Sequence, residues 1–199
     1  MSKKFKPALA TLLITTMLLS QSTVALAFTT FNNHVLNGGV GNYGYNNRYY
    51  YITSSAGGYS SLITSAMNDW IYTTSRLGIT TPVSFLRTYT QSSSVMDIYA
   101  GYYKDPSYGI VGYTTFWIYG TRVDPMASNW GWGKIRLNQP NYDWLSAYNK
   151  QGTAAHEMGH VMGLNENNSN PGSVMCQLAY GRYVNSAQAD DCNGINYLY

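Results

Sequence analysis

The feature that most constrains this chain is an eleven-residue segment from His156 to Glu166, with the sequence HEMGHVMGLNE. It holds both glutamates of the chain and two of its three histidines. His156 and His160 are four residues apart, so on a helix they share one face and can bind one ion. A joint role for the two imidazoles therefore requires a helix here, and the rest of the fold must leave room for a metal beside it.

A catalytic zinc site needs three protein ligands and one open position. The third ligand must follow the helix, and Gly163 can end that helix because glycine adopts the left-handed conformation readily. The chain can then turn back and bring Glu166 to the ion. We predict Glu166 as the third ligand, with Asn165, Asn167 or a water molecule as the alternatives.

Glu157 directly follows the first histidine and is rotated about 100° from it around the helix, so it need not bind the ion. A carboxylate there can accept a proton from a metal-activated water and pass it to a leaving amine. We predict Glu157 as the general base of an amide hydrolysis. A core helix with two hydrogen-bonded histidines is the alternative interpretation of the same short pattern.

The first residues have the pattern of an export signal, with three lysines, an apolar run over residues 8–19 and the small-x-small sequence Ala25-Leu26-Ala27. We predict a signal peptide at 1–27 and one secreted domain at 28–199. A retained membrane anchor is the alternative, but the run is shorter than the roughly 20 residues of a membrane span. No later stretch is long and apolar enough to cross a bilayer.

Charge limits the range of partners. Three of the 12 basic residues lie in the signal, which leaves nine basic against nine acidic residues. No basic run or cluster of Lys and Arg among aromatics is present, so we expect no nucleic-acid partner. A surface rich in Tyr, Asn, Ser, Thr and Gly favours an extracellular protein, which we expect to be a monomer that is not membrane-bound after signal cleavage.

Cys176 and Cys192 are the only cysteines. An even pair in an exported protein predicts a disulfide, which would tie the segment after the metal helix to the C-terminal helix. Two free buried thiols and a thiol metal site are the alternatives.

Hydrophobic periodicity predicts a single α/β (α+β) domain with one mixed sheet. The predicted strands are 48–53, 82–89, 96–102, 109–118 and 134–137, the last after an aromatic, Gly-rich turn at 130–133. The predicted helices are 60–77, about 151–163 and about 186–198.

The segment His156 to Glu166, followed by Ser173-Val174-Met175, resembles the signature and Met-turn of the metzincin zinc endopeptidases. Within that clan the chain is most similar to bacterial secreted matrixin-like peptidases. The likeness is strong at 153–199 and looser over 45–152. It implies one catalytic Zn²⁺, a cleft between an upper lobe with a twisted sheet and a lower lobe, and Met175 as an apolar floor under the metal.

The chain departs from the metzincin pattern in three ways. Glu166 replaces the usual third His or Asp, and its charge should make the bound water less acidic. Residues 28–45 contain no inhibitory cysteine, so activity is expected without a cysteine latch. No Asp-rich calcium loop is found, so structural calcium is unsupported.

The substrate is expected to be a protein or peptide, lying along an edge strand within Gly109 to Phe116. A non-catalytic extracellular binding module on a protease-like fold is the main alternative, and an enzyme that cuts a cell-wall amide is another.

Five further residues are interpreted without catalytic roles. His34 is predicted to be a surface residue, and Asp190 and Asp191 are predicted to cap the last helix or to lie on a solvated face. An oxyanion role for Tyr180 or Tyr183 is the less favoured interpretation among 20 tyrosines.

Overall fold

The fold is known from a computed structural model, which describes residues 28–41 and 48–199. The predicted signal peptide at 1–27 lies outside the described residues. A six-stranded sheet has the order β2-β1-β3-β6-β4-β5. The strands are β1 (Tyr49–Ile52), β2 (Leu86–Thr88), β3 (Met96–Gly101), β4 (Gly112–Ile118), β5 (Thr121–Val123) and β6 (Trp132–Asn138). Strands β1, β2, β3 and β6 are parallel, whereas β4 is antiparallel to both of its neighbours.

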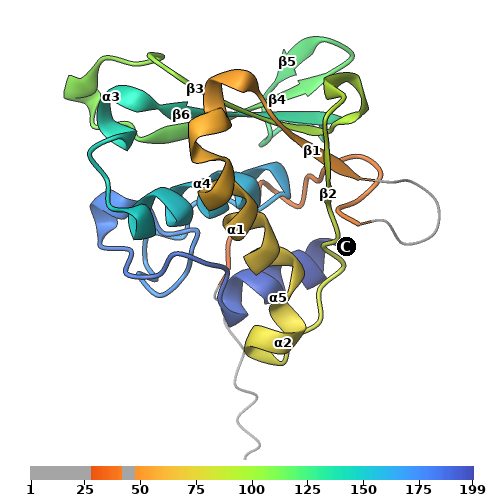
Figure 1. Cartoon of the computed structure of the whole chain (residues 1–199). Coiled ribbons are helices and arrows are strands. Elements are labelled where there is room, and N and C mark those ends of the chain that lie inside the picture. The colour runs from red at the N-terminus through yellow and green to blue at the C-terminus, as the bar shows by residue number, and fades with distance from the viewer. Residues whose placement is uncertain (1–27, 42–47) are drawn as a thin grey trace, which may run out of the picture.

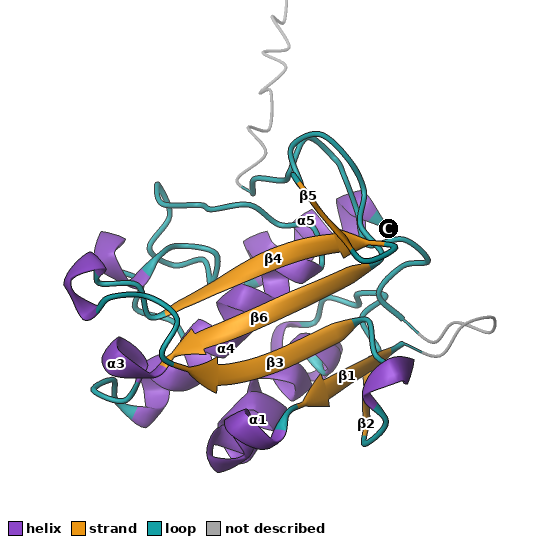
Figure 2. Cartoon of the chain, turned by 90° about the horizontal axis from the view of Figure 1, so that it is seen from above, coloured by secondary structure: helices purple, strands orange, loops and turns teal. Residues whose placement is uncertain are grey.

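All α-helices lie on one side of the sheet or at its end (Figure 1). They are α1 (Ser60–Ile71), α2 (Thr73–Leu77), α3 (Gln139–Tyr142), α4 (Ala147–Val161) and α5 (Ala189–Leu198). Short 3-10 helices occur at η1 (Ser54–Tyr59), η2 (Gln91–Ser93), η3 (Pro106–Tyr108) and η4 (Leu178–Tyr180). Seen from above, the sheet lies in front of α1 and α4 (Figure 2). The predicted α/β fold with a mixed sheet, an active-site helix and a C-terminal helix is confirmed.

The core lies between the sheet and the helices α1 and α4. Strand alternation points Met96 and Ile98 of β3, and Ile135 and Leu137 of β6, into this core, where all four are fully buried. The indole of Trp70 on α1 donates a hydrogen bond to the carbonyl of Ala155 on α4, over 3.0 Å. A second buried indole, that of Trp130, donates to the carbonyl of Val161 over 2.9 Å. Helix α4 is thus fixed from two sides.

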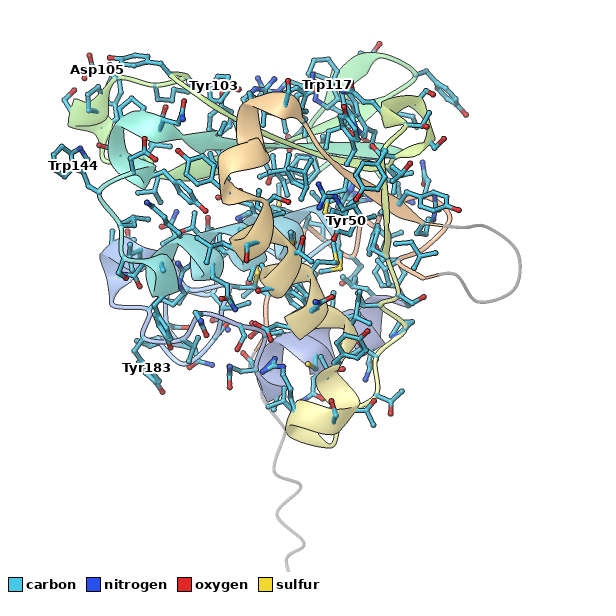
Figure 3. The ribbon with its side chains drawn as sticks, in the orientation of Figure 1. Tyr50, Tyr103, Asp105, Trp117, Trp144 and Tyr183 are labelled. Atoms are coloured by element: carbon cyan, nitrogen blue, oxygen red, sulfur yellow. The ribbon has the colours of Figure 1, made fainter. Side chains whose placement is uncertain are left out.

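The outer face of the sheet carries aromatic rings and cations in place of a helix layer. The Lys134 ammonium lies 4.5 Å from the centroid of the Trp132 ring and 5.4 Å from that of Trp117. The Arg136 guanidinium lies 5.8 Å from the Tyr103 ring. Trp117 and Tyr103 project above the sheet, on the side away from the helices (Figure 3). Such cross-strand pairs cover one another, so this face can meet solvent without an apolar patch.

Several element boundaries differ from the sequence predictions. The predicted helix 60–77 is divided at Tyr72, and Gly78, with φ of 71°, ends the second part. The predicted strand 82–89 pairs with β1 only at 86–88. Val83 and Phe85, just before it, are buried, and the Ser84 amide between them donates to the carbonyl of Val40 over 3.1 Å. Strand β6 begins at Trp132, within the predicted turn.

Besides the short 3-10 helices, one strand and one α-helix were absent from the prediction. Strand β5 forms a hairpin with β4 through Tyr119 and Gly120, which both have positive φ. Helix α3 is a single turn with a proline in its first turn. Among the described residues, no helix is both long enough and apolar enough to span a membrane.

Candidate metal centre

Helix α4 begins earlier than predicted and ends where Gly163 turns the chain. Ser146 is the N-cap, and its hydroxyl accepts a hydrogen bond from the Asn149 amide over 3.2 Å. At the other end, the amide of Leu164 donates to the carbonyl of Gly159 over 3.0 Å, and Gly163 has φ of 102°. This is a Schellman ending, which favours glycine because of the positive φ. It directs the following residues back toward the helix.

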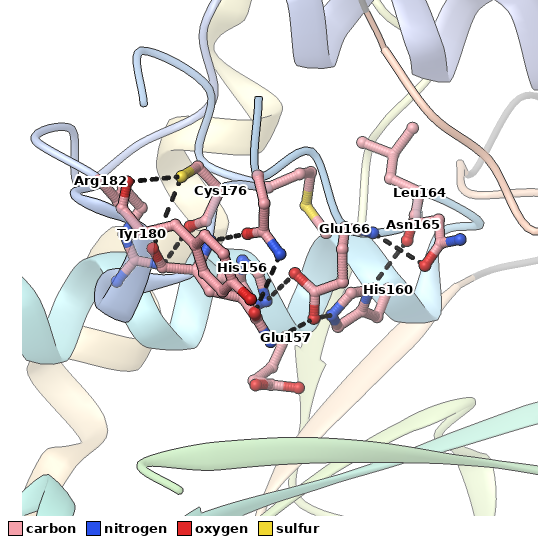
Figure 4. Close-up of polar contacts among 12 residues, drawn as sticks. His156, Glu157, His160, Leu164, Asn165, Glu166, Cys176, Tyr180 and Arg182 are labelled. Atoms are coloured by element: carbon pink, nitrogen blue, oxygen red, sulfur yellow. Dashed lines mark hydrogen bonds and ion pairs between the residues drawn. The ribbon is translucent and has the colours of Figure 1, made fainter. Parts of the chain in front are cut away.

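The turn brings together the three predicted metal ligands (Figure 4). The Nε2 atoms of His156 and His160 lie 3.4 and 3.3 Å from the two carboxylate oxygens of Glu166. One ligand atom from each of the three residues lies within 4.8 Å of the others. The two imidazoles are buried, and Glu166 is partly exposed toward the cleft. Two nitrogens and a carboxylate are a donor set that suits zinc.

Hydrogen bonds to the backbone orient both imidazoles. The Nδ1 atom of His156 lies 2.9 Å from the carbonyl of Val174, and that of His160 lies 2.9 Å from the carbonyl of Leu164. A carbonyl can only accept, so each Nδ1 carries a proton and each Nε2 is left as the donor atom for an ion. This is the arrangement that supports metal-bound histidines generally.

Electrostatics in the cluster favour a cation. Burial lowers the pKa of His160, but the hydrogen bond that His160 donates to Glu166 and the charges of Glu157 and Glu166 outweigh it, so the pKa lies above the ordinary value. Burial alone would raise the pKa of Glu166, yet the interactions with His156 and His160 beside it hold that pKa far below its usual range. The Oε2 atom of Glu166 is buried without a hydrogen-bond partner. A bound cation would satisfy this oxygen, so the residues present fit a zinc ion.

The alternative third ligands are engaged elsewhere. The side-chain oxygen of Asn165 accepts a hydrogen bond from the Glu166 amide over 2.8 Å, and that of Asn167 accepts one from Ser169 over 3.2 Å. The Oε1 atom of Glu166 in turn accepts from the Gln177 amide group over 3.0 Å. The geometry therefore favours Glu166.

Glu157 faces the cleft from α4, beside the three predicted metal ligands (Figure 4). Only 4% of the residue is exposed, and its Oε2 atom accepts a hydrogen bond from the Thr114 hydroxyl over 2.8 Å. Strand β4 approaches closely here, because a Cβ added to Gly112 would lie 3.1 Å from Glu157 Oε1. The carboxylate is thus oriented by the strand and is not among the three clustered ligands.

The predicted Met-turn packs under the helix. Met175 is 2% exposed, and a Cβ on Gly159 would lie 2.3 Å from its sulfur atom. Glycine is needed there because methionine contacts the helix backbone directly. Contact with Met175 therefore limits how closely α4, which carries the two histidines, can approach the Met-turn.

Asp191 ties the Met-turn to helix α5. Its carboxylate accepts hydrogen bonds from the Ser173 hydroxyl, from the Val174 amide over 3.0 Å and from the Gln188 amide over 2.8 Å. The last of these belongs to a capping box, which confirms the predicted capping role. The carbonyl of Val174 holds His156, so Asp191 positions a ligand through one intervening residue.

The cleft beside the cluster has a volume of about 760 Å³. The three predicted metal ligands and Glu157 line one side of the cleft, which we call its floor. Residues 109–114 line the other side, which we call its upper wall. The predicted edge at 109–116 is confirmed in part: β4 starts at Gly112, and β5 pairs only with Phe116–Ile118. Among the described strands, none covers the outer edge of β4 before Phe116. That edge offers unpaired backbone groups along the cleft.

Sequence reasoning missed three contributors to this site. Phe31 lines the cleft, with its ring centroid 5.6 Å from that of His160. The Thr29 hydroxyl donates to the carbonyl of Glu166 over 2.6 Å. Arg182 lines the cleft as well, although only 6% of it is exposed. None of the three belongs to a recognisable motif, and only the fold reveals them.

Three residues given no catalytic role in the sequence analysis, His34, Tyr180 and Tyr183, do not line the cleft. His34 is partly exposed, and its Nδ1 lies 3.2 Å from the side-chain oxygen of Asn129. Tyr180 and Tyr183 are 59% and 68% exposed and are not among the residues that line the cleft. The structure therefore gives no geometric support for an oxyanion role of either tyrosine.

The predicted disulfide is wrong, because Cys176 and Cys192 are both free and buried. The Cys176 thiol faces the carbonyls of Gln177 and Tyr180, whereas Cys192 lies in the hydrophobic core. Burial raises the pKa of both thiols, to about 12 for Cys192. Two protonated thiols that face different surroundings explain why an even cysteine count was misleading.

One comparison with known proteins, that with family models, agrees with the site. The family model for peptidase family M10, described as Matrixin, matches residues 59–199, which include every residue of the metal cluster. Among solved structures, the chain is similar to a chain in the GM1-bound form of the ECX AB5 holotoxin, with 17% identity and a TM-score of 0.44. That similarity covers 86% of this chain and 90% of the other. A search of curated proteins gave no match.

Proposed function

Because the chain belongs to the matrixin family of zinc metallopeptidases, we propose that it is a secreted, monomeric endopeptidase in which Glu157 is the general base. The observation that carries this proposal is the geometry of the cluster. His156, His160 and Glu166 converge on one point, and Glu157 faces the same cleft without joining them. We assign 28–199 as the catalytic domain and 1–27 as its signal peptide.

His156, His160 and Glu166 would hold one zinc ion, which would lower the pKa of a water molecule and polarise the carbonyl of the scissile bond. The two backbone carbonyls that accept from the histidine Nδ1 atoms keep both Nε2 atoms available. Glu166 adds a negative charge, which favours retention of a doubly charged ion.

Glu157 accepts the proton of the attacking water on its carboxylate and then delivers it to the nitrogen of the leaving amine. The Thr114 hydroxyl, 2.8 Å from Glu157 Oε2, holds one oxygen in place and leaves the other for the proton. The low exposure of Glu157 excludes most competing solvent from this transfer.

The substrate binds in an extended conformation along the open edge of β4. The backbone groups of residues 112–115 on that edge can pair with a peptide as an added strand, which gives affinity independent of sequence. Such pairing suits an unfolded segment of a protein, which is the substrate class we propose.

The decisive experiment is casein hydrolysis by the purified protein, with and without a zinc chelator, beside the Glu157→Ala variant with its zinc content measured. We expect the chelator to abolish hydrolysis and the variant to keep its zinc while losing activity by a factor of about 10² to 10⁴. Stoichiometric zinc without cleavage of casein or of a broad peptide library would refute general proteolysis. It would favour the binding-module alternative.

A further inference from the structure

Arg182 is the one cation that faces the cleft from within the protein, among the described residues that line it. It is 6% exposed, so almost all of its side chain has been removed from water. Its neighbours at that end of the cleft include Thr153 of α4 and Leu178 of η4. Burying a guanidinium is costly unless a carboxylate or several acceptors compensate for it.

The compensation that the described residues provide is small. One terminal nitrogen donates to the carbonyl of Cys176 over 3.5 Å, and the other donates to the Thr153 hydroxyl over 3.2 Å. The Nε atom is buried and has no hydrogen-bond partner. Among the described residues no carboxylate lies within 4.0 Å of the guanidinium, because their only ion pairs are Arg76 with Asp69 and the two histidines with Glu166.

The nearest negative charges already have other partners. Glu157 and Glu166 both act electrostatically on Arg182, but neither forms an ion pair with it. Glu157 accepts from Thr114, and Glu166 lies between the two histidines. The guanidinium thus has no carboxylate partner among the described residues, and Arg182 lines a cavity that is large enough for a ligand.

The position of Arg182 relative to the reacting centre follows from α4. Thr153, which contacts the guanidinium, lies four residues before Glu157, or roughly 6 Å along a helix. A peptide bond at Glu157 would therefore place the side chain of an adjacent residue near Arg182. A planar, bidentate carboxylate matches a guanidinium better than any other peptide side chain.

We propose that Arg182 forms a carboxylate-binding subsite in this cleft, so that the enzyme prefers Asp or Glu beside the scissile bond. This inference rests on the proposed endopeptidase function and adds a substrate class to it. The subsite is built from the guanidinium, the Thr153 hydroxyl and the apolar wall of Leu178. Arg182 is here a specificity residue that contacts substrate and takes no part in proton transfer.

The test uses two succinyl hydroxamates that differ only in a carboxymethyl or a carboxamidomethyl side chain. Their affinities for the zinc-loaded protein are measured by calorimetry. The carboxylate compound is expected to bind about tenfold or more tightly than the carboxamide, as charge-assisted pairs do in closed sites. The ratio should fall to near one in Arg182→Gln, should be intermediate in Arg182→Lys, and should be unchanged in Arg122→Gln, a change of an exposed arginine on β5 that does not line the cleft.

Equal binding of the two compounds to the wild-type protein would overturn the subsite, whatever the variants do. An Arg182→Gln variant that weakens both compounds equally would also overturn it and would make Arg182 a structural clamp for the Met-turn loop. Cleavage of a peptide mixture, with cut sites identified by mass spectrometry, then separates the two proposals. If the hydroxamates bind with the expected ratio but no peptide is cut, the endopeptidase function fails and the carboxylate subsite stands.

Discussion

The floor and the upper wall of the cleft are built on different principles. On the floor, each functional side chain is fixed by a specific partner: Val174 and Leu164 hold the histidines, and Gln177 holds Glu166. The upper wall offers mainly backbone, at the open edge of β4. Under the proposed function, side chains position the ion and Arg182 selects one substrate side chain, whereas the β4 edge binds the substrate backbone whatever its sequence.

Among changes to the floor residues, Glu166→Gln should have the largest effect, which is a loss of zinc affinity. The amide keeps the size of the side chain but loses its charge, so zinc affinity should fall at least about 100-fold, the upper range for losing an outer-shell partner. Competition titration against a zinc-binding dye measures this change. Glu166→His, which restores the usual metzincin ligand, is the matched control. Unchanged affinity in Glu166→Gln would assign the third ligand to another group.

Asp191→Ala should weaken the metal site indirectly, because Asp191 is not one of the predicted ligands. This change leaves the amides of Val174 and Gln188 without their acceptor, which should lower the free energy of unfolding by about 3 kcal/mol. Zinc affinity should fall as well, because Val174 no longer holds His156 firmly. Urea denaturation and zinc titration measure the two effects. Asp190→Ala is the control, because Asp190 accepts hydrogen bonds from the side chains of Asn167 and Asn170 and not from Val174, and an equal effect there would contradict the positioning role.

Gly159→Ala should disturb the packing between α4 and the Met-turn, because it places a methyl group against the sulfur atom of Met175. The overpacking should cost about 1–3 kcal/mol of unfolding free energy. The double variant Gly159→Ala, Met175→Ala should be more stable than the sum of the two single changes predicts. If thermal or urea unfolding shows that the free-energy changes of the two single variants simply add in the double variant, Met175 does not limit the position of α4.

The smallest effect should come from the upper wall, with Thr114→Val. Loss of one hydrogen bond to Glu157 should reduce kcat/KM about fivefold, equivalent to about 1 kcal/mol, with the zinc content unchanged. Thr115→Val, on the opposite face of β4, controls for strand stability. A loss of zinc in Thr114→Val would remove the distinction between floor and wall.

Sequence patterns predicted the floor better than the wall. His156, His160 and Glu166, which lie together as the pattern predicted, could be singled out with Glu157 because helix periodicity and metal chemistry both restrict their spacing. Helix α4 was predicted to start four residues late, since Asn149 and Lys150 hide the periodicity, although Ser146 is a recognisable cap. The start of a helix with a polar first turn is therefore better predicted from its capping residue than from hydrophobic periodicity.

The remaining errors have tertiary causes. Strand β5 was missed because its turn places Tyr119, a bulky residue, at positive φ. Arg182 and Phe31 reach the cleft only through long-range packing, which no local pattern encodes. The cysteine pair failed because composition indicates how many thiols exist but not which way they face.

The two indoles that donate to α4 also give the protein an optical property. Trp70 and Trp130 are completely buried and hydrogen-bond to carbonyls at the two ends of the segment that carries the histidines. Any loosening of that segment must change the polarity around at least one indole. The intrinsic fluorescence and near-ultraviolet circular dichroism of the unlabelled protein should therefore respond to changes in the helix, and both signals can be followed in real time during chelation.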